Sequence, residues 1–453
     1  MLINFSVSNY LSFKGKQSFS MISQSYEQEF FIEDHILKSS ILFGANAAGK
    51  SNLISAIGLF REIILSANKE LEKNILDQVI PFLLDNKSKE QPTEFEITFL
   101  AENDLLYKYG IKVSNGIIFR EWLYFSNNEI KLNEVELFQR EGNKLTYINE
   151  ELFPEAKNFY NEEKYLIQTK ENVPFITDMA GTSSKHSLAI INWLKKLKIL
   201  SGLSDDGFIQ YSLKLLEKNK DFSIWIQEFL SSVNINKIKF VDKEVVLEEK
   251  VKAINSLIQL VDKIDKDKLS KEQEDNLMLL SKLTDFLNVV NSQNKKNTAS
   301  THEKIVEVIK NIDGDEYHIP LHLESSGTKK LIALLGPIFD SIEKNHVLVI
   351  DEIDAKFHTL LMKKFFSIFL RDTKKCQLIA TAQDTNLISK DIFNRDQIWF
   401  VNKDEFGESE LYSLIEFKES ALSDESYETR YLKGAFGAVP LFPDYATIEN
   451  LME

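Results

Sequence analysis

The chain has 453 residues, 43% of them hydrophobic, which is enough to bury the cores of roughly two to three domains and excludes a disordered or fibrous protein. A formal net charge of −15, from 69 acidic and 54 basic residues, repels phosphate polymers at long range, so DNA binding would need a local basic patch. The sequence has one cysteine, Cys376, no secretory leader pattern and no apolar run of about 18 residues. We therefore expect a soluble cytoplasmic protein without a membrane domain.

The first clear elements are a short strand and a helix. Ser40–Phe43 has the pattern of a buried strand that leads into a glycine-containing turn. After the turn, apolar residues recur at spacings of four, three and four, which predicts a helix with one buried face. These residues are Leu53, Ile57, Phe60 and Ile64.

The turn between this strand and this helix fits a phosphate-binding motif. Gly44–Ser51 matches the pattern G-x-x-x-x-G-K-[ST], in which backbone N–H groups and the helix N-terminus hold phosphates. We expect Lys50 to neutralise the β- and γ-phosphates of ATP and Ser51 to bind Mg²⁺. The predicted nucleotide contacts in this segment are Gly44, Asn46, Gly49, Lys50, Ser51 and Asn52.

The next segments predict a sheet and a helix beside this core. Apolar and polar residues alternate from Glu94 to Phe125, with a hairpin turn at Asn115-Gly116, which predicts an antiparallel sheet. Leu188–Leu203 has the pattern of a helix.

A helical insertion is expected over residues 205–300. Apolar residues recur at helical spacing over 251–261 and over 280–290, on either side of the charged connection 265–272. Two amphipathic helices in an antiparallel hairpin, such as a coiled coil, fit this pattern, and a packed helical subdomain fits it equally. The polar tract 291–300 predicts a loop or linker.

The chain then returns to the core through a second predicted hairpin, which turns at Asp313-Gly314. Glu324–Lys330 precedes an apolar helix over 331–339. The serine hydroxyls, Gly327 and the start of a helix can together bind an anion, although Ser-Ser-Gly at a helix start is more often a simple cap.

Two carboxylates follow the apolar strand Val347–Ile350, at the carboxyl end where ligands of α/β proteins bind. We expect Asp351 to hold Mg²⁺ through water and Glu352 to act on the attacking water, as a general base or an orienting group. A solvated turn after a core strand is the alternative, and the phosphate loop favours the catalytic interpretation. His358 could reach the nucleotide or simply begin a helix.

These motifs together resemble a known family. GANAAGKSN, with Ser325–His358, resembles the AAA-15 class of ABC-type ATPases, which is related to the RecF and SMC proteins. Arg430–Pro440 is similar to the closing segment of that class. The class includes the ATPase subunits of phage-defence systems such as RloA, AriA of PARIS and abortive infection L. The resemblance covers roughly the first 125 and the last 150 residues.

The resemblance implies that ATP binds between two copies of the chain. Gly44–Ser51 of one copy would face Ser325, Ser326 and Gly327 of the other. Asp354 would then lie in the loop that crosses the dimer interface. About 280 residues separate the two motifs, and an insertion of this size fits the RecF- and SMC-like branch.

The chain departs from the family pattern at one position. The resemblance implies a histidine that contacts the γ-phosphate after the strand Leu378–Ala380, and this chain has Gln383 there. Glutamine can hydrogen-bond a phosphate oxygen but cannot become cationic, so we expect slow hydrolysis or an ATP-gated switch. The catalytic residues are therefore predicted to be Glu352, Lys50 and Gln383.

We predict an α/β fold, with an ABC-type P-loop core, an antiparallel β subdomain and a helical insertion, divided at 1–204, 205–300 and 301–453. By resemblance, the chain is an ATPase of a phage-defence (abortive infection) system, which uses ATP and Mg²⁺ and assembles as a homodimer or a higher homo-oligomer. It would control a separate effector, a TOPRIM/OLD-like nuclease, in response to a phage protein or DNA. Two alternatives are a RecF- or SMC-like repair ATPase that binds DNA directly and a nucleotide-locked scaffold without meaningful turnover.

Overall fold

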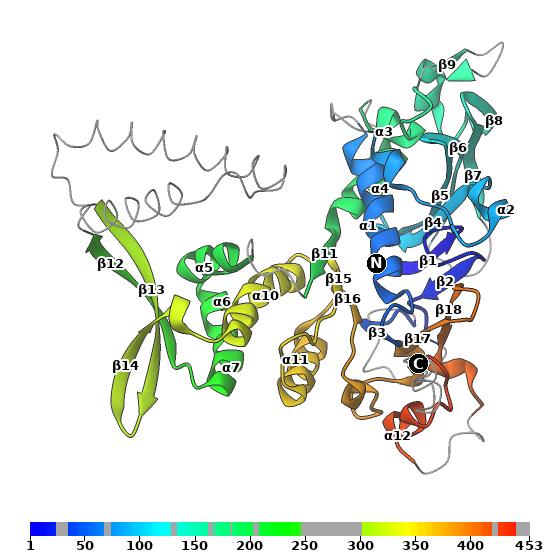
Figure 1. Cartoon of the computed structure of the whole chain (residues 1–453). Helices are drawn as coiled ribbons and strands as arrows, with labels where there is room; N and C mark the ends of the chain where they lie inside the picture. Colours follow the sequence, from blue (N-terminus) through cyan, green and yellow to red (C-terminus); the bar gives the residue numbers. More distant parts are fainter. Residues whose placement is uncertain are drawn as a thin grey trace, which may run out of the picture. The chain divides into compact units, whose positions relative to one another are not determined.

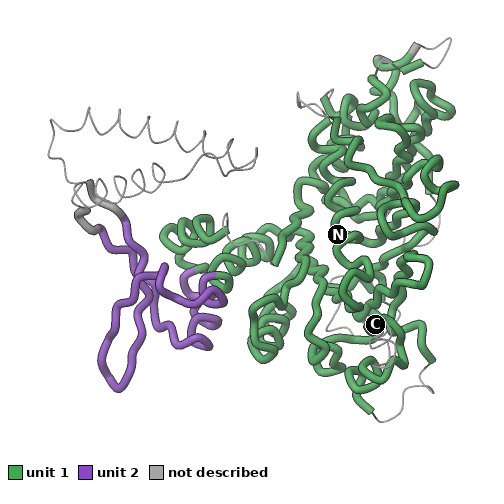
Figure 2. The backbone as a smooth tube through the Cα atoms, viewed as in Figure 1, with its two compact units in different colours: residues 1–222, 330–453 green, residues 223–329 purple. Residues whose placement is uncertain are grey.

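The computed structural model describes residues 1–23, 35–67, 74–127, 134–161, 166–167, 169–181, 184–202, 208–245, 301–418 and 425–440 (Figure 1). The chain divides into two compact units, which we call the core unit and the small unit (Figure 2). The core unit contains Met1–Phe222 and Lys330–Glu453, and the small unit contains Ser223–Lys329. In the described part of the chain, no helix is long and apolar enough to cross a membrane.

The centre of the core unit is a six-stranded sheet in which all strands but the last are parallel. Its strands come from both ends of the sequence. Strand β3 (Ser39–Phe43) lies between two strands that follow it by more than 330 residues. In spatial order the strands are β11 (Leu197–Ser201), β15 (Val347–Asp351), β16 (Gln377–Thr381), β3 (Ser39–Phe43), β17 (Ile398–Lys403) and β18 (Ser409–Ser413).

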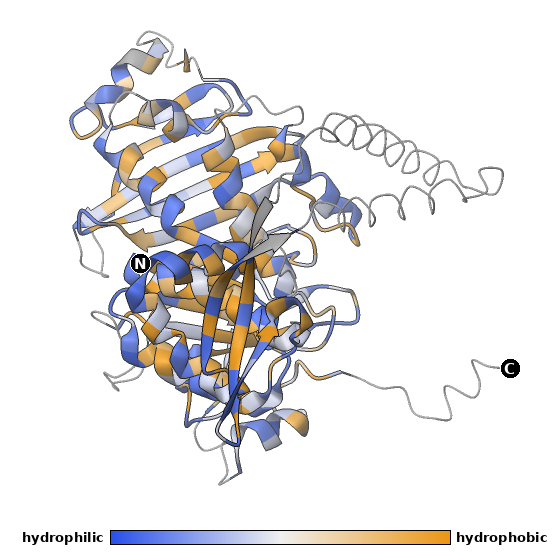
Figure 3. Cartoon of the chain, turned by 90° about the vertical axis from the view of Figure 1, so that its left-hand side faces the viewer, coloured by the Kyte–Doolittle hydropathy of each residue, from blue (hydrophilic) through white to orange (hydrophobic). Residues whose placement is uncertain are grey.

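A second, antiparallel sheet forms the β subdomain of the core unit. In Figure 3 its strands change repeatedly between hydrophobic and hydrophilic colours along their length, as expected when one face is buried. In spatial order the strands are β2 (Gln17–Ser20), β1 (Leu2–Ser8), β4 (Thr93–Leu100), β5 (Leu105–Ser114), β6 (Ile117–Asn127), β7 (Val135–Glu141), β8 (Lys144–Ile148), β10 (Leu166–Ile167) and β9 (Tyr160–Asn161). The predicted α/β class, with a parallel core and an antiparallel subdomain, is confirmed.

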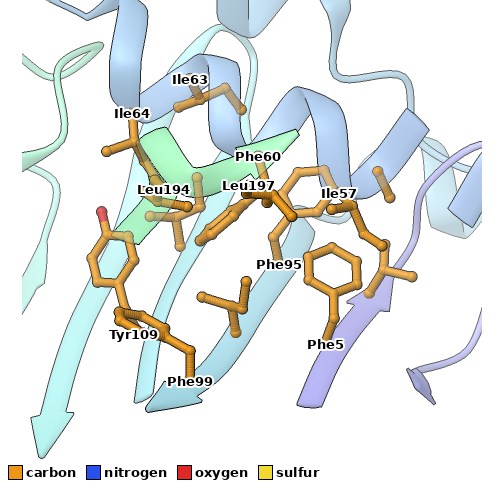
Figure 4. Packing of buried hydrophobic residues seen from close by; sticks show 14 of the residues in the cluster. Phe5, Ile57, Phe60, Ile63, Ile64, Phe95, Phe99, Tyr109, Leu194 and Leu197 are labelled. Carbon is orange, nitrogen blue, oxygen red and sulfur yellow. The ribbon is translucent and has the colours of Figure 1, made fainter. Parts of the chain in front are cut away.

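Helix α1 (Lys50–Ser66) packs between the two sheets. Its apolar face is fully buried, and Phe60 lies edge-on to Phe5 of β1 with ring centroids 6.2 Å apart (Figure 4). The same cluster includes Val349 of β15 and Ile379 of β16. Burial of several large side chains, each worth about 1.5–3 kcal/mol, therefore fixes the helix that follows the phosphate loop.

Gln377 ties the two sheets together. Its Nε2 donates to Leu2 O at 3.0 Å and to Leu37 O at 3.1 Å, and its Oε1 accepts from Leu2 N at 2.5 Å. The side chain is fully buried at the start of β16. One amide thus satisfies backbone groups of β1 and of the segment before β3.

A buried ion pair holds the far end of the β subdomain. Glu121 and Arg140 are both fully buried, with Arg140 Nε 2.8 Å from Glu121 Oε2. Glu121 also accepts hydrogen bonds from the backbone N–H groups of Phe175 and Ile176, at the start of helix α3 (Phe175–Ala180). The pair therefore anchors α3 on the sheet.

The other core-unit helices surround these sheets. They are α2 (Asn86–Lys89), α4 (Lys185–Lys196), α5 (Phe208–Lys218), α11 (Thr359–Asp372) and α12 (Tyr427–Leu432). Two further helices cross the boundaries between the units, α6 (Lys220–Trp225) and α10 (Ser326–Glu343).

The small unit contains a three-stranded antiparallel sheet and the short helix α7 (Gln227–Leu230). The strands are β12 (Lys237–Val245), β13 (Thr301–Ile312) and β14 (Asp315–Pro320). The predicted hairpin at Asp313-Gly314 is thus present. Most of the predicted insertion, including both amphipathic segments at 251–261 and 280–290, lies outside the described residues.

Two sequence expectations were wrong. The helix predicted over Leu188–Leu203 ends at Lys196, and the chain continues as strand β11, because this short apolar run completes the sheet beside β15. Strand β12 lies in the region expected to be helical. Its alternation of Lys237 and Lys239 with Ile238 and Phe240 has the two-residue period of a strand, and β12 pairs with β13.

Candidate nucleotide site

The phosphate loop connects β3 to α1. Its backbone conformation and close contacts require glycine at both ends of the loop, at Gly44 and Gly49. Gly49 has φ +118°, and a Cβ there would lie 2.5 Å from Ser409 Oγ and 2.8 Å from Ser12 Oγ. A Cβ on Gly44 would overlap the carbonyl oxygen of Val401. No other residue type fits these positions without moving the loop.

Lys50 is held against the loop that precedes it. Its Nζ donates to Gly44 O at 2.6 Å and to Ala45 O at 3.1 Å, and the residue is 6% exposed. Burial lowers the pKa of Lys50, while Asp351, Glu352 and Asp354 act in the opposite direction. The loop carbonyls therefore orient an ammonium group that the three nearby carboxylates favour in its charged form.

Two serines outside the predicted motifs stabilise the loop. Ser409 Oγ donates to Ala48 O at 2.5 Å and lies 2.7 Å from Ser12 Oγ. Asn52 Nδ2 donates to the same Ser12 Oγ at 2.7 Å. A single serine in a loop or an edge strand has no local signature, so only the fold reveals this contact between distant segments.

The two carboxylates after β15 are joined by a hydroxyl from the neighbouring strand. Thr381 Oγ1, at the end of β16, donates to Asp351 Oδ1 at 2.5 Å and accepts from Glu352 N at 2.7 Å. Glu352 has φ +51°, in the left-handed region where a non-glycine residue costs of order 1–3 kcal/mol. The role of Thr381 has no local signature in the sequence, because it depends on the pairing of β16 with β15.

Gln383 connects the predicted catalytic residue to the loop that follows it. Its Nε2 donates to Glu352 Oε1 at 3.1 Å, and its backbone N–H donates to Asp354 Oδ2 at 2.8 Å. Asp384 N also donates to Asp354 Oδ2, at 2.6 Å, and the Asp384 carboxylate accepts from Thr359 Oγ1 at the start of α11. The structure therefore brings Glu352, Asp354 and Gln383 into one hydrogen-bond network.

The side chains expected to bind Mg²⁺ lie on one cavity. Ser51 and Asp351 both line a cavity of about 890 Å³, together with Ser201, Asp77 and Gln78. A hydroxyl and a carboxylate are hard oxygen donors that suit Mg²⁺, which takes its remaining ligands from phosphates and water. Among the described residues no group of three or more His, Cys, Asp or Glu side chains could hold a metal alone.

The Ser-Ser-Gly segment belongs to the small unit, whereas the phosphate loop belongs to the core unit. Ser325 Oγ accepts from Thr328 N at 3.1 Å, so it caps the start of α10. Ser325 and Ser326 are exposed, and Gly327 is half-buried. The cap leaves both serines accessible to a ligand.

Two other candidates have structural roles. His358 begins α11, where its Nδ1 accepts from Leu360 N at 3.2 Å. Cys376 is buried before β16, and burial raises the pKa of its thiol to about 12, so it carries no reactive thiolate.

Comparison with known proteins places the site in a family. Residues 39–389 match the sequence model of the family described as "AAA domain, putative AbiEii toxin, Type IV TA system". The matched range begins at β3 and extends beyond Gln383, so it contains the phosphate loop and all the other residues named above for the site except Ser12, Val401 and Ser409. No curated protein matches the chain.

Several solved structures of SMC head domains are similar to the chain, all at low identity. One is an Smc head bound to the C-terminal winged-helix domain of ScpA, with 12% identity and a TM-score of 0.43, covering 91% of this chain and 97% of that one. A second is the SMC head domain from Thermotoga maritima, with 11% identity, a TM-score of 0.39 and coverage of 91% and 98%. A third, from Pyrococcus furiosus, is an Smc head with an extended coiled coil bound to the C-terminal domain of ScpA, with 14% identity, a TM-score of 0.37 and coverage of 91% and 96%.

The predicted P-loop core is present as a parallel sheet whose β3 strand leads through the phosphate loop into α1, beside the carboxylates at the end of β15. Because the family match covers most of the sequence, the chain belongs to the AAA-domain ATPase family associated with AbiEii and type IV toxin–antitoxin systems.

Proposed function

We propose that this protein is an ATP-driven switch of a phage-defence system, which binds and slowly hydrolyses ATP with Mg²⁺ and controls a separate effector nuclease. The family match supports ATP binding and an association with toxin–antitoxin systems. The resemblance of the motifs to abortive-infection ATPases supports the defence role and the effector.

Each residue has a defined part in the proposed reaction. Backbone N–H groups of Gly44–Ser51 hold the phosphates, and Lys50 Nζ leaves the loop carbonyls to neutralise the β- and γ-phosphates. Ser51 and Asp351, which line one cavity, would hold Mg²⁺, and the bound ion would offset charge on the phosphate oxygens. Glu352 orients the attacking water or accepts its proton.

The network around Gln383 is the observation that carries the switch proposal. Gln383 contacts Glu352 through its side chain and Asp354 through its backbone, so a movement of Gln383 towards a γ-phosphate would disturb both. Because the amide stays neutral, it stabilises the transition state less than a cationic histidine would, which favours slow turnover. A long-lived ATP state is what a switch requires.

The proposed ATP state is a homodimer or a larger homo-oligomer. By resemblance, Ser325, Ser326 and Gly327 of a second copy would close on the phosphates, and Asp354 would lie at the interface. The accessible Ser-Ser-Gly at the start of α10 is compatible with that role.

The test is a pull-down of the tagged chain, expressed with the product of its neighbouring gene, with ATP and Mg²⁺ present. We expect a nuclease-like partner to be recovered with the unchanged protein and with Glu352→Gln, and its recovery to change for Lys50→Ala. Lys403→Ala, which alters a lysine at the end of β17, is the matched control. Equal recovery of the partner with all four proteins would show that ATP does not gate the complex.

A DNA-binding ATPase is the second candidate, and a cluster of lysines favours it. Burial, and then the charges of Lys198, Lys344 and Lys196, lower the pKa of His346 just before β15, while Asp340 raises it. Lys196 and Lys344 also pair with Glu102 and Asp340. DNA-stimulated ATP turnover, with affinity that falls steeply as salt rises, would support this function over the switch.

A further inference from the structure

Two large apolar side chains are exposed in the core unit beside the phosphate loop. Phe406, in the turn between β17 and β18, is 72% exposed, and Leu84 is 71% exposed. A Cβ on Gly407 would overlap Leu84 Cδ1, so the turn and the segment that carries Leu84 are in contact. Exposed apolar side chains that gather in this way often mark a binding site.

The turn that carries Phe406 is fixed by hydrogen bonds. Asp404 Oδ1 accepts from Phe406 N at 3.0 Å and from Glu408 N at 2.8 Å, and Gly407 N donates to Asp404 O at 3.1 Å. Glu408 Oε1 accepts from Gly15 N at 2.9 Å, which ties the turn to the N-terminal loop. The aromatic ring is therefore presented on an ordered backbone, which lowers the entropic cost of binding to it.

The same turn is attached to the phosphate loop. Ser409 begins β18, and its side chain donates to Ala48 O, while its N–H donates to Ser12 O at 2.7 Å. Phe406 lies three residues before Ser409, so their Cα atoms are at most about 11 Å apart. A nucleotide whose phosphates lie on the loop extends its sugar and base over a comparable distance.

We propose that Phe406 and Leu84 form the nucleobase subsite for the nucleotide whose phosphates bind at Gly44–Ser51. A purine has a flat apolar face that stacks on an aromatic ring, and Leu84 offers an aliphatic surface beside it. This proposal rests on the proposed nucleotide binding at the phosphate loop. It adds the residues that hold the nucleobase of the same ligand. Because stacking does not depend on base edges, the subsite would accept both adenine and guanine.

The test compares ATP with inorganic tripolyphosphate, which has the phosphates but no base, by calorimetric titration of the full chain with Mg²⁺. For Phe406→Ala we expect ATP affinity to fall about tenfold or more, since one base stacked on an aromatic ring contributes on that scale, and tripolyphosphate affinity to stay within about twofold. Phe406→Trp should retain ATP affinity. Phe119→Ala, which removes an exposed phenylalanine of β6, is the matched control.

Equal affinities of Phe406→Ala and the unchanged protein for ATP would overturn the subsite. So would an equal loss for ATP and tripolyphosphate, because the effect would then be on the loop. A change in molecular mass by light scattering, with ATP affinity unchanged, would instead assign the two side chains to contact with a second copy. Lys50→Ala should weaken both ligands, and if it weakens neither, or if the unchanged protein binds neither, the proposed nucleotide binding itself fails.

Discussion

The side-chain amide of Gln383 donates a hydrogen bond to Glu352 Oε1 across 3.1 Å, although the residues are 31 positions apart. They follow β16 and β15, which are adjacent in the parallel sheet. The residue that stands where the family resemblance implies a histidine therefore contacts the carboxylate expected to act on water.

Replacing Gln383 tests this contact. For Gln383→Leu we expect ATP turnover to fall about tenfold or more, because Glu352 loses the donor that orients it. ATP affinity should change little, and the melting temperature should be unchanged because Gln383 is exposed. Steady-state ATPase assays and titration of ATP check both parts. Unchanged turnover would show that the amide plays no part in catalysis.

Thr381 positions both carboxylates, so removing its hydroxyl should affect Mg²⁺ as well as turnover. Thr381→Val keeps the shape of the side chain but leaves Asp351 without its 2.5 Å donor and Glu352 N without its acceptor. We expect turnover to fall about tenfold and the Mg²⁺ concentration for half-maximal rate to rise. Thr381→Ser should restore both. If serine behaves as valine does, packing and not the hydroxyl is responsible.

Gly49 should not tolerate a side chain. Gly49→Ala places a methyl group at φ +118° against Ser12 and Ser409, and we expect nucleotide binding to be lost and stability to fall by about 1–3 kcal/mol. Gly142→Ala is the control, because Gly142 also has positive φ (+55°) but a Cβ there would meet no atom within 4 Å. Thermal unfolding and ATP titration distinguish the two. If both variants lose the same stability, the strain of a positive φ explains the loss at Gly49, and the contacts with Ser12 and Ser409 do not.

Gln377 is expected to contribute strongly to stability. Gln377→Leu leaves Leu2 N, Leu2 O and Leu37 O without a buried partner, so we expect a loss of about 2–4 kcal/mol. The loss appears as a melting temperature lower by several degrees. Gln210→Leu, at an exposed position of α5, is the control. A melting temperature equal to that of the control variant would contradict the bridge between the sheets.

We expect the folded state to lose stability in mild acid because of His346. Burial, with Lys198 next in effect, lowers its pKa to about 4 from 6.5, so between these values the unfolded chain binds more protons than the folded one. Stability from this residue is complete above about pH 6.5 and decreases as the pH falls towards 4, by up to about 3 kcal/mol. The free energy of unfolding, measured at pH 7 and at pH 5, tests this expectation. His346→Asn should show a smaller difference between the two pH values.

Local patterns in the sequence are sufficient to predict many elements of the core unit. The phosphate loop, the strand that ends at Asp351 and the hairpin at Asn115-Gly116 each depend on neighbouring residues, and each is present. Two residues with positive φ, 52° and 72°, form that turn. Such features need no knowledge of distant contacts.

The missed features depend on contacts between distant segments. Ser12 and Ser409 meet 397 positions apart, and Thr381 reaches Asp351 and Glu352 only because β16 lies beside β15. Strand β11 was expected to be helical because five residues are too few to show a period. Its conformation follows from the vacant edge of β15, which no local pattern encodes.

The order of strands in the parallel sheet also bears on how the protein is made. Strand β3 lies between β16 and β17, which leave the ribosome more than 330 residues later. At roughly 5–20 residues per second, the phosphate loop is synthesised tens of seconds before its neighbouring strands exist. Until then, the apolar strand Ser39–Phe43 cannot be paired within this sheet, and the nascent chain cannot hold a nucleotide in the completed site. The phosphate loop therefore gains its neighbouring strands, and with them the completed site, only after β17 has been synthesised.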